Sequence, residues 1–398
     1  MNLFPFKKKP SLSFVFDIRD TFITIAAVKF EQNKKPELVL CQNFEIKTQE
    51  PINNQKYLSS MISTFDKGII SLRKSLIKIG NKEKIDKLFF FIGSPWCVSQ
   101  SKMIKIIKDR PFEINKKFLE KIINTEENDE KKEIEKIEGI ADWGILEEKI
   151  IQSKLNGYKI DQIFGKKASD LEIELFVSFV PREIKDKLSF SEYENFQKHA
   201  LRHLNSCILS SYSFLRDLYS DKNDFIYIDI GDIITDAYIV KNDVVYAIVS
   251  VPFGRKEIIR STSVKTKMPE DVLLSALHIN YSGDYVNSTE KIEQFIGDGV
   301  KFWLKKLNES ILKVCTEINV PKNVFIIINN ELANILIKEI ENNKESNQSC
   351  IFNKDTEIVS IGESVLNDFI TNGKIFKNEP YVKMDLVFLD KILKQNNE

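Results

Sequence analysis

The chain has 398 residues, of which 42% are hydrophobic and 11% are aromatic, so it can bury a sizeable core and its length predicts two or three domains. Lysine plus arginine and aspartate plus glutamate both number 58, which gives a formal net charge of zero and excludes a chain-wide basic field for nucleic acid. No stretch approaches the ~18 uninterrupted apolar residues of a membrane-spanning helix, so we expect no transmembrane segment.

The cysteines and the N-terminal tail predict a cytoplasmic protein. The five cysteines lie far apart with no Cys-x-x-Cys pair, which is typical of reduced, buried thiols and not of disulfides or a zinc site. In the tail, residues 1–9, apolar residues precede three lysines, which is the wrong order for a signal peptide. The tail is either a disordered terminus or a segment that docks on a groove or on acidic lipid at the inner membrane face.

The first half of the chain predicts two different segments. The periodicity of the first 93 residues predicts strands at 13–17, 22–30, 38–46 and 88–93 and a helix at 55–79. The next segment predicts strands at 99–107, 146–153, 158–163 and 171–180, a helix at 114–124, and a solvated mixed-charge run at 126–138. The pattern over 191–218 predicts one long helix.

The second half repeats the opening pattern. It predicts strands at 225–230, 234–240, 244–251 and 324–328, a helix at 290–318, a helix beginning at Glu331, a polar loop at 341–354, and a short element at 385–393. Each half opens with an apolar strand that ends in an aspartate and turns into a hairpin. This recurrence predicts an internal structural duplication.

The two hairpins carry the functional inference. They are FDIRDT, residues 16–21, and IDIGDIITD, residues 228–236. A strand that ends in aspartate and turns tightly can direct backbone amides at a phosphate and offer a carboxylate to a hydrated magnesium ion. The alternative is that each aspartate only caps its own turn. The pairing of two such hairpins favours a nucleotide site.

In this order, the stretches FDIRDTFITIAAV, IDIGDIITDAYIVKNDVVYAIVSVPFGRKEI and VFIIINNELANIL resemble the actin-like ATPase superfamily, and within it PilM and FtsA. The likeness covers nearly the whole chain after the tail. It implies an α/β fold of two ribonuclease-H-like domains with a small α+β subdomain inserted in the first. The implied domains are a flexible tail at 1–10, a first actin-like domain at 11–93 and 182–222, an inserted partner-binding subdomain at 94–181, a second actin-like domain at 223–355, and a C-terminal segment at 356–398 that returns towards the first domain.

The resemblance also implies a site for ATP and Mg²⁺ between the hairpins. Asp17 and Asp229 would be the metal ligands, and no residue that positions an attacking water can be identified. The implied nucleotide-binding positions are Asp17, Thr21, Asp229, Gly231, Thr235, Asp236, Gly254, Asn329 and Asn330.

Several of the family's glycines are replaced, which predicts a degenerate site. The replacements and other departures in the three loops are Arg19, Asp20, Thr24, Asp232, Ile233, Asn329, Asn330 and Glu331. Glycine allows a left-handed backbone and close approach to a ligand, so its loss narrows such a loop. Asp20 and Asp232 add negative charge where a phosphate would lie, which Arg19 partly offsets. We therefore expect at most weak ATP binding or hydrolysis.

His199 and His203 have the spacing of a zinc pair on a helix, but the sequence between them lacks the glutamate of a metalloprotease and no third ligand is evident. We interpret them as helix-surface residues.

By resemblance, the expected function is that of a PilM-like cytoplasmic scaffold in bacterial type IV pilus assembly. It would bind the cytoplasmic segment of a PilN-like inner-membrane protein, and its inserted subdomain would hold the partner or self-associate. The tail residues Asn2-Leu3-Phe4-Pro5 resemble the Asn-Leu-Leu-Pro peptide by which PilN engages PilM. One alternative is an FtsA-like cell-division protein that links a tubulin-like polymer to the membrane, although 385–393 is short and weakly charged for the membrane helix of FtsA. The other is an active ATPase or kinase of the superfamily.

Overall fold

The computed structural model describes residues 12–48, 53–81, 83–138, 142–189, 201–281, 289–316, 318–328, 333–344, 351–377 and 379–395. The chain divides into two compact units. Unit 1 comprises Met1–Gly93, Asp186–Phe214 and Gly362–Glu398, and unit 2 comprises Ser94–Lys185 and Leu215–Ile361.

Unit 1 is built on a five-stranded sheet of order β3-β2-β1-β4-β9. The strands are β1 (Leu12–Ile18), β2 (Phe22–Lys29), β3 (Glu37–Glu45), β4 (Ile85–Ile92) and β9 (Leu201–Ser206). The first three are antiparallel, and β4 and β9 continue in parallel. Strand β1 is buried along its whole length because its side chains are covered on both faces of the sheet.

Two helices cover the sheet of unit 1. Helix α1 (Asn54–Lys78) begins at the Asn53 cap, and its Phe65 ring packs against Phe16 of β1. On the other face, α10 (Pro380–Gln395) places Leu386 and Phe388 in a cluster with Val15 and Phe91. The remaining helices of this unit are α9 (Glu363–Leu366), the short η1 (Asn367–Phe369), and parts of α3 (Arg182–Ser189) and α4 (Cys207–Leu218). The first residues of α3 and the last residues of α4 belong to unit 2.

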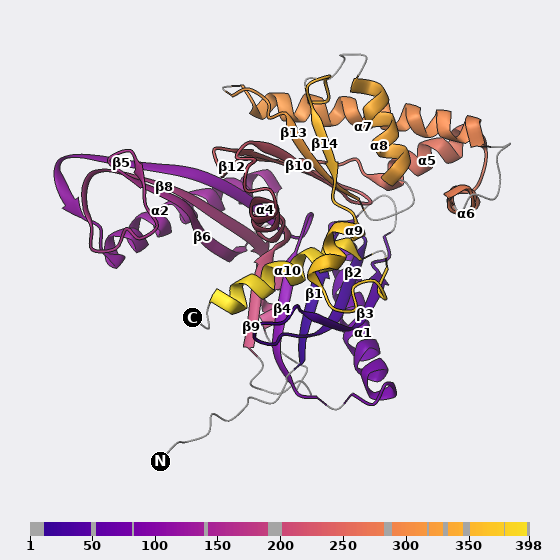
Figure 1. Cartoon of the computed structure of the whole chain (residues 1–398), viewed down its shortest axis with the longest axis horizontal. Coiled ribbons are helices and arrows are strands. Elements are labelled where there is room, and N and C mark those ends of the chain that lie inside the picture. Colours follow the sequence, from indigo (N-terminus) through magenta and orange to yellow (C-terminus); the bar gives the residue numbers. More distant parts are fainter. Residues whose placement is uncertain are drawn as a thin grey trace. The chain divides into compact units, whose positions relative to one another are not determined.

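Unit 2 contains a second five-stranded sheet with the same order, β12-β11-β10-β13-β14. The strands are β10 (Phe225–Ile230), β11 (Thr235–Lys241), β12 (Val244–Val251), β13 (Asn323–Ile328) and β14 (Glu357–Ser360). Figure 1 shows this sheet with its helices α5 (Arg255–Thr266), α6 (Glu270–Tyr281), α7 (Thr289–Val314) and α8 (Ala333–Lys344). The same strand order in both units agrees with the internal duplication predicted from the sequence.

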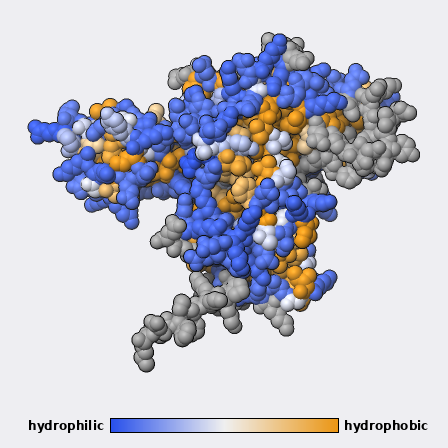
Figure 2. All heavy atoms as spheres, in the orientation of Figure 1, coloured by the Kyte–Doolittle hydropathy of each residue, from blue (hydrophilic) through white to orange (hydrophobic). Residues whose placement is uncertain are grey.

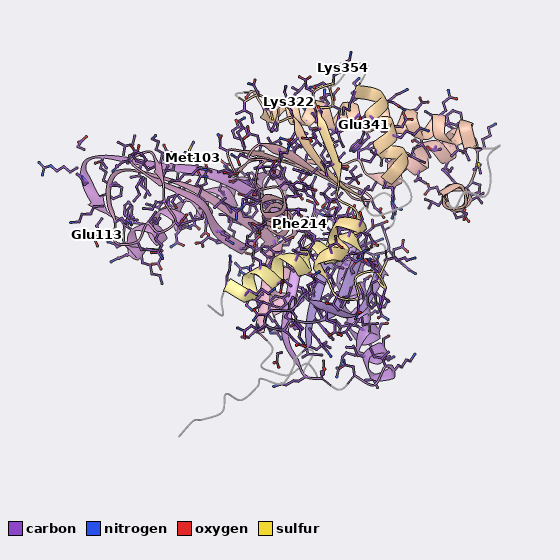
Figure 3. All side chains as sticks on the ribbon, viewed as in Figure 1. Met103, Glu113, Phe214, Lys322, Glu341 and Lys354 are labelled. Carbon is purple, nitrogen blue, oxygen red and sulfur yellow. The ribbon has the colours of Figure 1, made fainter. Side chains whose placement is uncertain are left out.

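The inserted segment of unit 2 forms a separate four-stranded antiparallel sheet of order β5-β8-β6-β7. Its elements are β5 (Val98–Glu113), α2 (Lys116–Glu138), β6 (Trp143–Leu155), β7 (Tyr158–Lys159) and β8 (Lys167–Pro181). Helix α2 packs one face of the sheet through Leu119, Ile123 and Ile134. Figure 3 shows Met103 partway along β5 and Glu113 towards the far end of this sheet.

The structure corrects several sequence-based predictions. The segment 191–218 is not one helix, because Leu201–Ser206 forms β9 beside β4 and only Cys207–Leu218 is helical. His203 therefore lies on a strand, stacked on Phe89 with ring centroids 5.1 Å apart, and His199 lies outside the described residues. Burial and nearby Lys87 lower the pKa of His203.

Three further element predictions are wrong in part. The predicted strand at 158–163 is reduced to Tyr158–Lys159, and α8 continues to Lys344 within the predicted polar loop. The short element at 385–393 belongs to a 16-residue helix, α10, whose Lys383 and Asp385 are fully buried.

The mixed-charge run at 126–138 is not wholly solvated, because Glu127 and Glu130 are buried where α2 faces the inserted sheet. Burial and the neighbouring Glu148 raise the pKa of Glu127 to about 7. Of the cysteines, Cys97, Cys207 and Cys315 are buried free thiols and Cys41 is a partly buried one, as predicted, while Cys350 lies outside the described residues.

Candidate functional site

The first hairpin, between β1 and β2, holds a buried ion pair. The Arg19 Nε donates to both carboxylate oxygens of Asp17, at 2.9 and 3.2 Å. Asp17 is 0% exposed and Arg19 6% exposed. The Cys207 thiol donates to the same carboxylate at 3.6 Å. The carboxylate that the sequence predicts as a magnesium ligand therefore has an internal cation beside it.

The Arg19 guanidinium is also enclosed by the C-terminal helix. Its Cζ lies 3.7 Å from the centroid of the Tyr381 ring at the start of α10, which is the geometry of a cation–π contact. Because Tyr381 comes more than 360 residues after Arg19, no local sequence pattern predicts this contact.

The turn of the first hairpin uses its own polar groups. The Arg19 amide donates to the carbonyl of Phe22 at 3.0 Å, which closes the turn. The Thr21 amide donates to the Asp20 carboxylate at 2.9 Å, and the Tyr57 hydroxyl donates to the Asp20 carbonyl. The Asp20 carboxylate thus occupies a backbone amide that a phosphate at this turn would need.

A second polar cluster lies beside this hairpin and joins the start of α10 to α9 and η1. Thr24 donates its hydroxyl to Glu379 at 3.3 Å, and the buried Lys383 ammonium donates to Glu363 at 2.9 Å and to Asn367 at 3.0 Å. Burial, followed by repulsion from Asp17, raises the pKa of Glu379 to about 7. Neither Glu379 nor Lys383 was predicted from the sequence as part of the site.

The second hairpin, between β10 and β11, brings five predicted residues together in unit 2. Asp229 and Asp236 are directly paired across the two strands, and Gly231 and Thr235 flank the turn. The Ser250 hydroxyl donates to Asp236 at 2.5 Å. The fifth residue, Gly254, lies against the turn, because a Cβ placed there would be 2.6 Å from the Gly231 and Asp232 carbonyl oxygens. Only glycine allows this approach.

The backbone donors near the second turn are also engaged by the protein. The Gly231 amide donates to the Ile234 carbonyl at 2.9 Å, and the first amides of α5, at Arg255 and Lys256, donate to the carbonyls of Gly231 and Asp232 at 3.0 and 2.8 Å. The Arg255 Nε donates to the Asp232 carboxylate at 2.7 Å. Arg255 thereby neutralises the charge that Asp232 adds to the loop.

Thr235 has a structural role in this arrangement. Its hydroxyl donates to the Phe253 carbonyl at 2.7 Å and accepts from the indole Nε1 of Trp303 at 3.0 Å. Trp303 is fully buried on α7, so the threonine joins the hairpin to the helix behind the sheet. The remaining predicted positions, Asn329 and Asn330, lie outside the described residues.

Comparison with known proteins identifies the fold. Neither a protein-family model nor a curated protein sequence matches the chain. Among solved structures, the PilM–PilN type IV pilus biogenesis complex matches with a TM-score of 0.55 and 11% identity, over 96% of this chain and 98% of the matched chain. A Bacteroides thetaiotaomicron protein with an actin-like ATPase fold and unknown function matches with a TM-score of 0.43 and 9% identity, over 94% and 98% of the two chains.

The chain has the actin-like ATPase fold. At these identities the likeness concerns the fold alone, and chemistry has to come from the residues. In this actin-like chain, the residues of the two hairpins do not fit Mg²⁺ and a phosphate well. Arg19 takes the position of a cation at Asp17, and the amides named above already have acceptors. An added phosphate would have to displace these internal bonds.

The actin-like chain also carries a groove in unit 2, with a volume of about 1070 Å³. It is lined by β6, by β7 and the segment after it, by the end of α4 and the loop that leads to β10, and by the turn between β11 and β12. Its lining combines apolar side chains such as Ile151 and Phe164 with charged ones such as Lys159, Arg216 and Asp243. Lys159 pairs with Asp243 at 3.4 Å across the groove. The sequence predicted the inserted subdomain as a binding surface but did not single out these residues.

Within the part of the chain that the structure describes, no helix is both long and apolar enough to cross a membrane.

Proposed function

We propose that this chain is an actin-like scaffold at the inner face of a bacterial membrane, which binds an extended cytoplasmic segment of a membrane-protein partner, as in the PilM–PilN complex. The observation that carries the proposal is the groove beside the inserted sheet. The fold likeness to a protein solved with its pilus partner supports it.

The shape and chemistry of the groove suit an extended peptide. Strand β6 lies along the groove, and β7 pairs with it at Lys154 and Leu155. Residues 150–152 of β6 lie beyond this short pairing, so on that side they form an edge of the sheet. A peptide can add to such an edge through main-chain hydrogen bonds and place alternate side chains in apolar pockets. Phe164, 61% exposed at the groove, is suited to contact an apolar side chain of the peptide.

The proposal also includes a nucleotide site that no longer needs ATP or a metal ion. The Arg19–Asp17 pair and the Arg255–Asp232 pair supply from within the chain the charge balance that a metal ion would supply in an active site. The scaffold would then hold its partner without ATP. This also disfavours the active ATPase or kinase alternative.

The peptide-binding part is tested by fluorescence anisotropy with a labelled synthetic peptide that contains Asn-Leu-Leu-Pro. We expect Phe164→Ser to weaken binding about tenfold, as expected for an apolar anchor of a peptide. Phe302→Ser is the matched control, because Phe302 is half exposed on α7 and is not part of the groove lining. Equal binding by the native chain and Phe164→Ser, or equal weakening by both variants, would contradict the groove assignment.

The nucleotide part is tested by isothermal titration with Mg²⁺ and ATP. We expect no heat of binding up to millimolar ATP for the native chain. Micromolar binding that disappears in Asp229→Ala would show that the site works in spite of its internal ion pairs, and the ATP-independent scaffold would be wrong.

A further inference from the structure

The outer face of α1 in unit 1 combines exposed isoleucines with lysines. Ile70 and Ile77, two turns apart, are 52% and 72% exposed, and Ile79, directly after the helix, is 57% exposed. Lys67, Lys74 and Lys78 are exposed on the same face, because residues three, four and seven positions apart lie in one stripe of a helix. We call Lys67, Ile70, Lys74, Ile77 and Lys78 the α1 stripe, and Ile79 does not belong to it because it is only two positions from Ile77.

The charge of α1 is one-sided in a chain that is neutral overall. The helix contains five lysines and arginines and one acidic residue, Asp66. Asp66 is paired with Lys187 at 3.3 Å, so its charge is already balanced beside the stripe. The described residues show no ion pair at Lys67, Lys74 or Lys78, which are therefore available to an external anion.

The stripe differs in charge from the exposed surface of α7. Helix α7 also exposes a large apolar residue, Phe302, near Lys301 and Lys305. However, its surface also carries Glu309, which would oppose contact with an anionic surface, whereas Asp298 is paired with Lys265 at 3.1 Å. Figure 2 shows hydrophobic residues next to hydrophilic ones over α1.

The rest of α1 makes the stripe a stable platform. The opposite side of the helix is held in the core by Met61, Phe65, Leu72 and Leu76, so the isoleucines cannot turn inward without unfolding the helix. A convex helix face offers no pocket for single side chains of a protein. It suits a surface into which isoleucines insert shallowly while lysine stems extend to headgroup phosphates.

We propose that the α1 stripe docks unit 1 on an anionic phospholipid surface. The interaction is independent of the groove in unit 2 and of the proposed peptide partner. The apolar residues would enter the boundary between headgroups and acyl chains, and the lysines would contact the phosphates.

The test is co-sedimentation of the full chain with vesicles. We expect binding to vesicles of phosphatidylcholine with phosphatidylglycerol, little binding to phosphatidylcholine alone, and weaker binding at high salt, because salt screens exposed charges. Lys74→Gln with Lys78→Gln should weaken binding about 30-fold, from ~1 kcal/mol per lysine near the surface. Ile77→Ser should weaken it about tenfold because one apolar side chain is lost.

The control is Lys301→Gln with Lys305→Gln on α7, which removes the same charge and should leave binding unchanged. Because all substituted residues are exposed, circular dichroism should show native folding for each variant. In the native chain, vesicles should increase the protection of α1 from hydrogen–deuterium exchange.

Four outcomes would overturn the proposal. The first is that the native chain does not bind anionic vesicles, and the second is that the α7 control loses as much binding as the α1 lysine variant. Alternatively, binding depends on Lys7, Lys8 and Lys9 and not on α1, in which case the tail binds the lipid. Finally, Ile77→Ser changes the mass in sedimentation velocity without any vesicle binding, in which case the face is an interface between copies of the chain.

Discussion

Removing the Arg19 side chain should strongly destabilise unit 1. In Arg19→Ala, the Asp17 carboxylate remains completely buried without the arginine cation, and the Cys207 thiol at 3.6 Å is a weak donor to it. Removing one partner of a buried ion pair typically costs about 3–5 kcal/mol, because the other charge is left uncompensated. The lost contact with the Tyr381 ring adds about 1–2 kcal/mol. We therefore expect the free energy of unfolding to fall by about 4–7 kcal/mol.

The assay is urea unfolding followed by circular dichroism, with hydrogen exchange of the β1 and β2 amides as the local measurement. Arg182→Ala is the matched control, because Arg182 and Asp142 form the same contact at 2.8 Å with both side chains about half exposed. We expect no measurable change from it. The double variant Arg19→Leu with Asp17→Asn should recover much of the lost stability. If Arg19→Ala unfolds at the same urea concentration as the native chain, the Asp17–Arg19 pair is not a structural substitute for a metal ion.

Three further predictions concern the two hairpins and the residues that contact them. Because its pKa is raised to about 7, Glu379 keeps its proton in the folded chain up to about pH 7, whereas a glutamate in the unfolded chain releases it near pH 4.5. Unit 1 should therefore lose stability as the pH rises through this interval. In thermal unfolding, Glu379→Gln should make the melting temperature less dependent on pH. Gly254→Ala should lower the melting temperature because the added Cβ would lie 2.6 Å from backbone atoms of the turn. Gly362→Ala is the control and should have a much smaller effect, because no atom lies within 4 Å of its Cβ position. Equal changes in melting temperature for the two variants would refute the steric argument. Thr235→Val should lower the free energy of unfolding by about 2–4 kcal/mol, because the Phe253 carbonyl and the Trp303 indole N–H both lose their hydrogen-bond partner. The measurement is unfolding followed by tryptophan fluorescence. An unchanged stability would mean that water replaces the hydroxyl.

The sequence predicted the parts of this fold that depend on local patterns. Both hairpins and the repeated opening of the two halves follow from alternation and turns over a few neighbouring residues, whereas the pairing of Arg19 with Asp17 was not predicted. The helix predicted at 191–218 failed because Leu201–Ser206 is fixed by parallel pairing with β4, more than 100 residues earlier. A helical period cannot report such a distant partner.

The candidate site shows the same division. The sequence showed which residues replace the glycines, but it could not show which contacts the replacing side chains make. Tyr381 over Arg19, Trp303 on Thr235 and Lys383 beside Glu363 are contacts between distant segments. The buried Glu127 was missed for a similar reason, since only the position of α2 over the inserted sheet shows that one side of a charged helix is enclosed. Residues without a local pattern need the tertiary structure to be assigned.

The discontinuous make-up of unit 1 has a consequence for its biosynthesis. Its central sheet is complete once β9 has been made, but one face of that sheet and the Arg19 guanidinium are covered by α10, residues 380–395. The whole of unit 2 is translated before this helix emerges from the ribosome. An apolar sheet face that waits for its cover is the kind of surface that chaperones bind. A nascent chain stalled before α10 should therefore carry a folded unit 2 beside an unfinished unit 1.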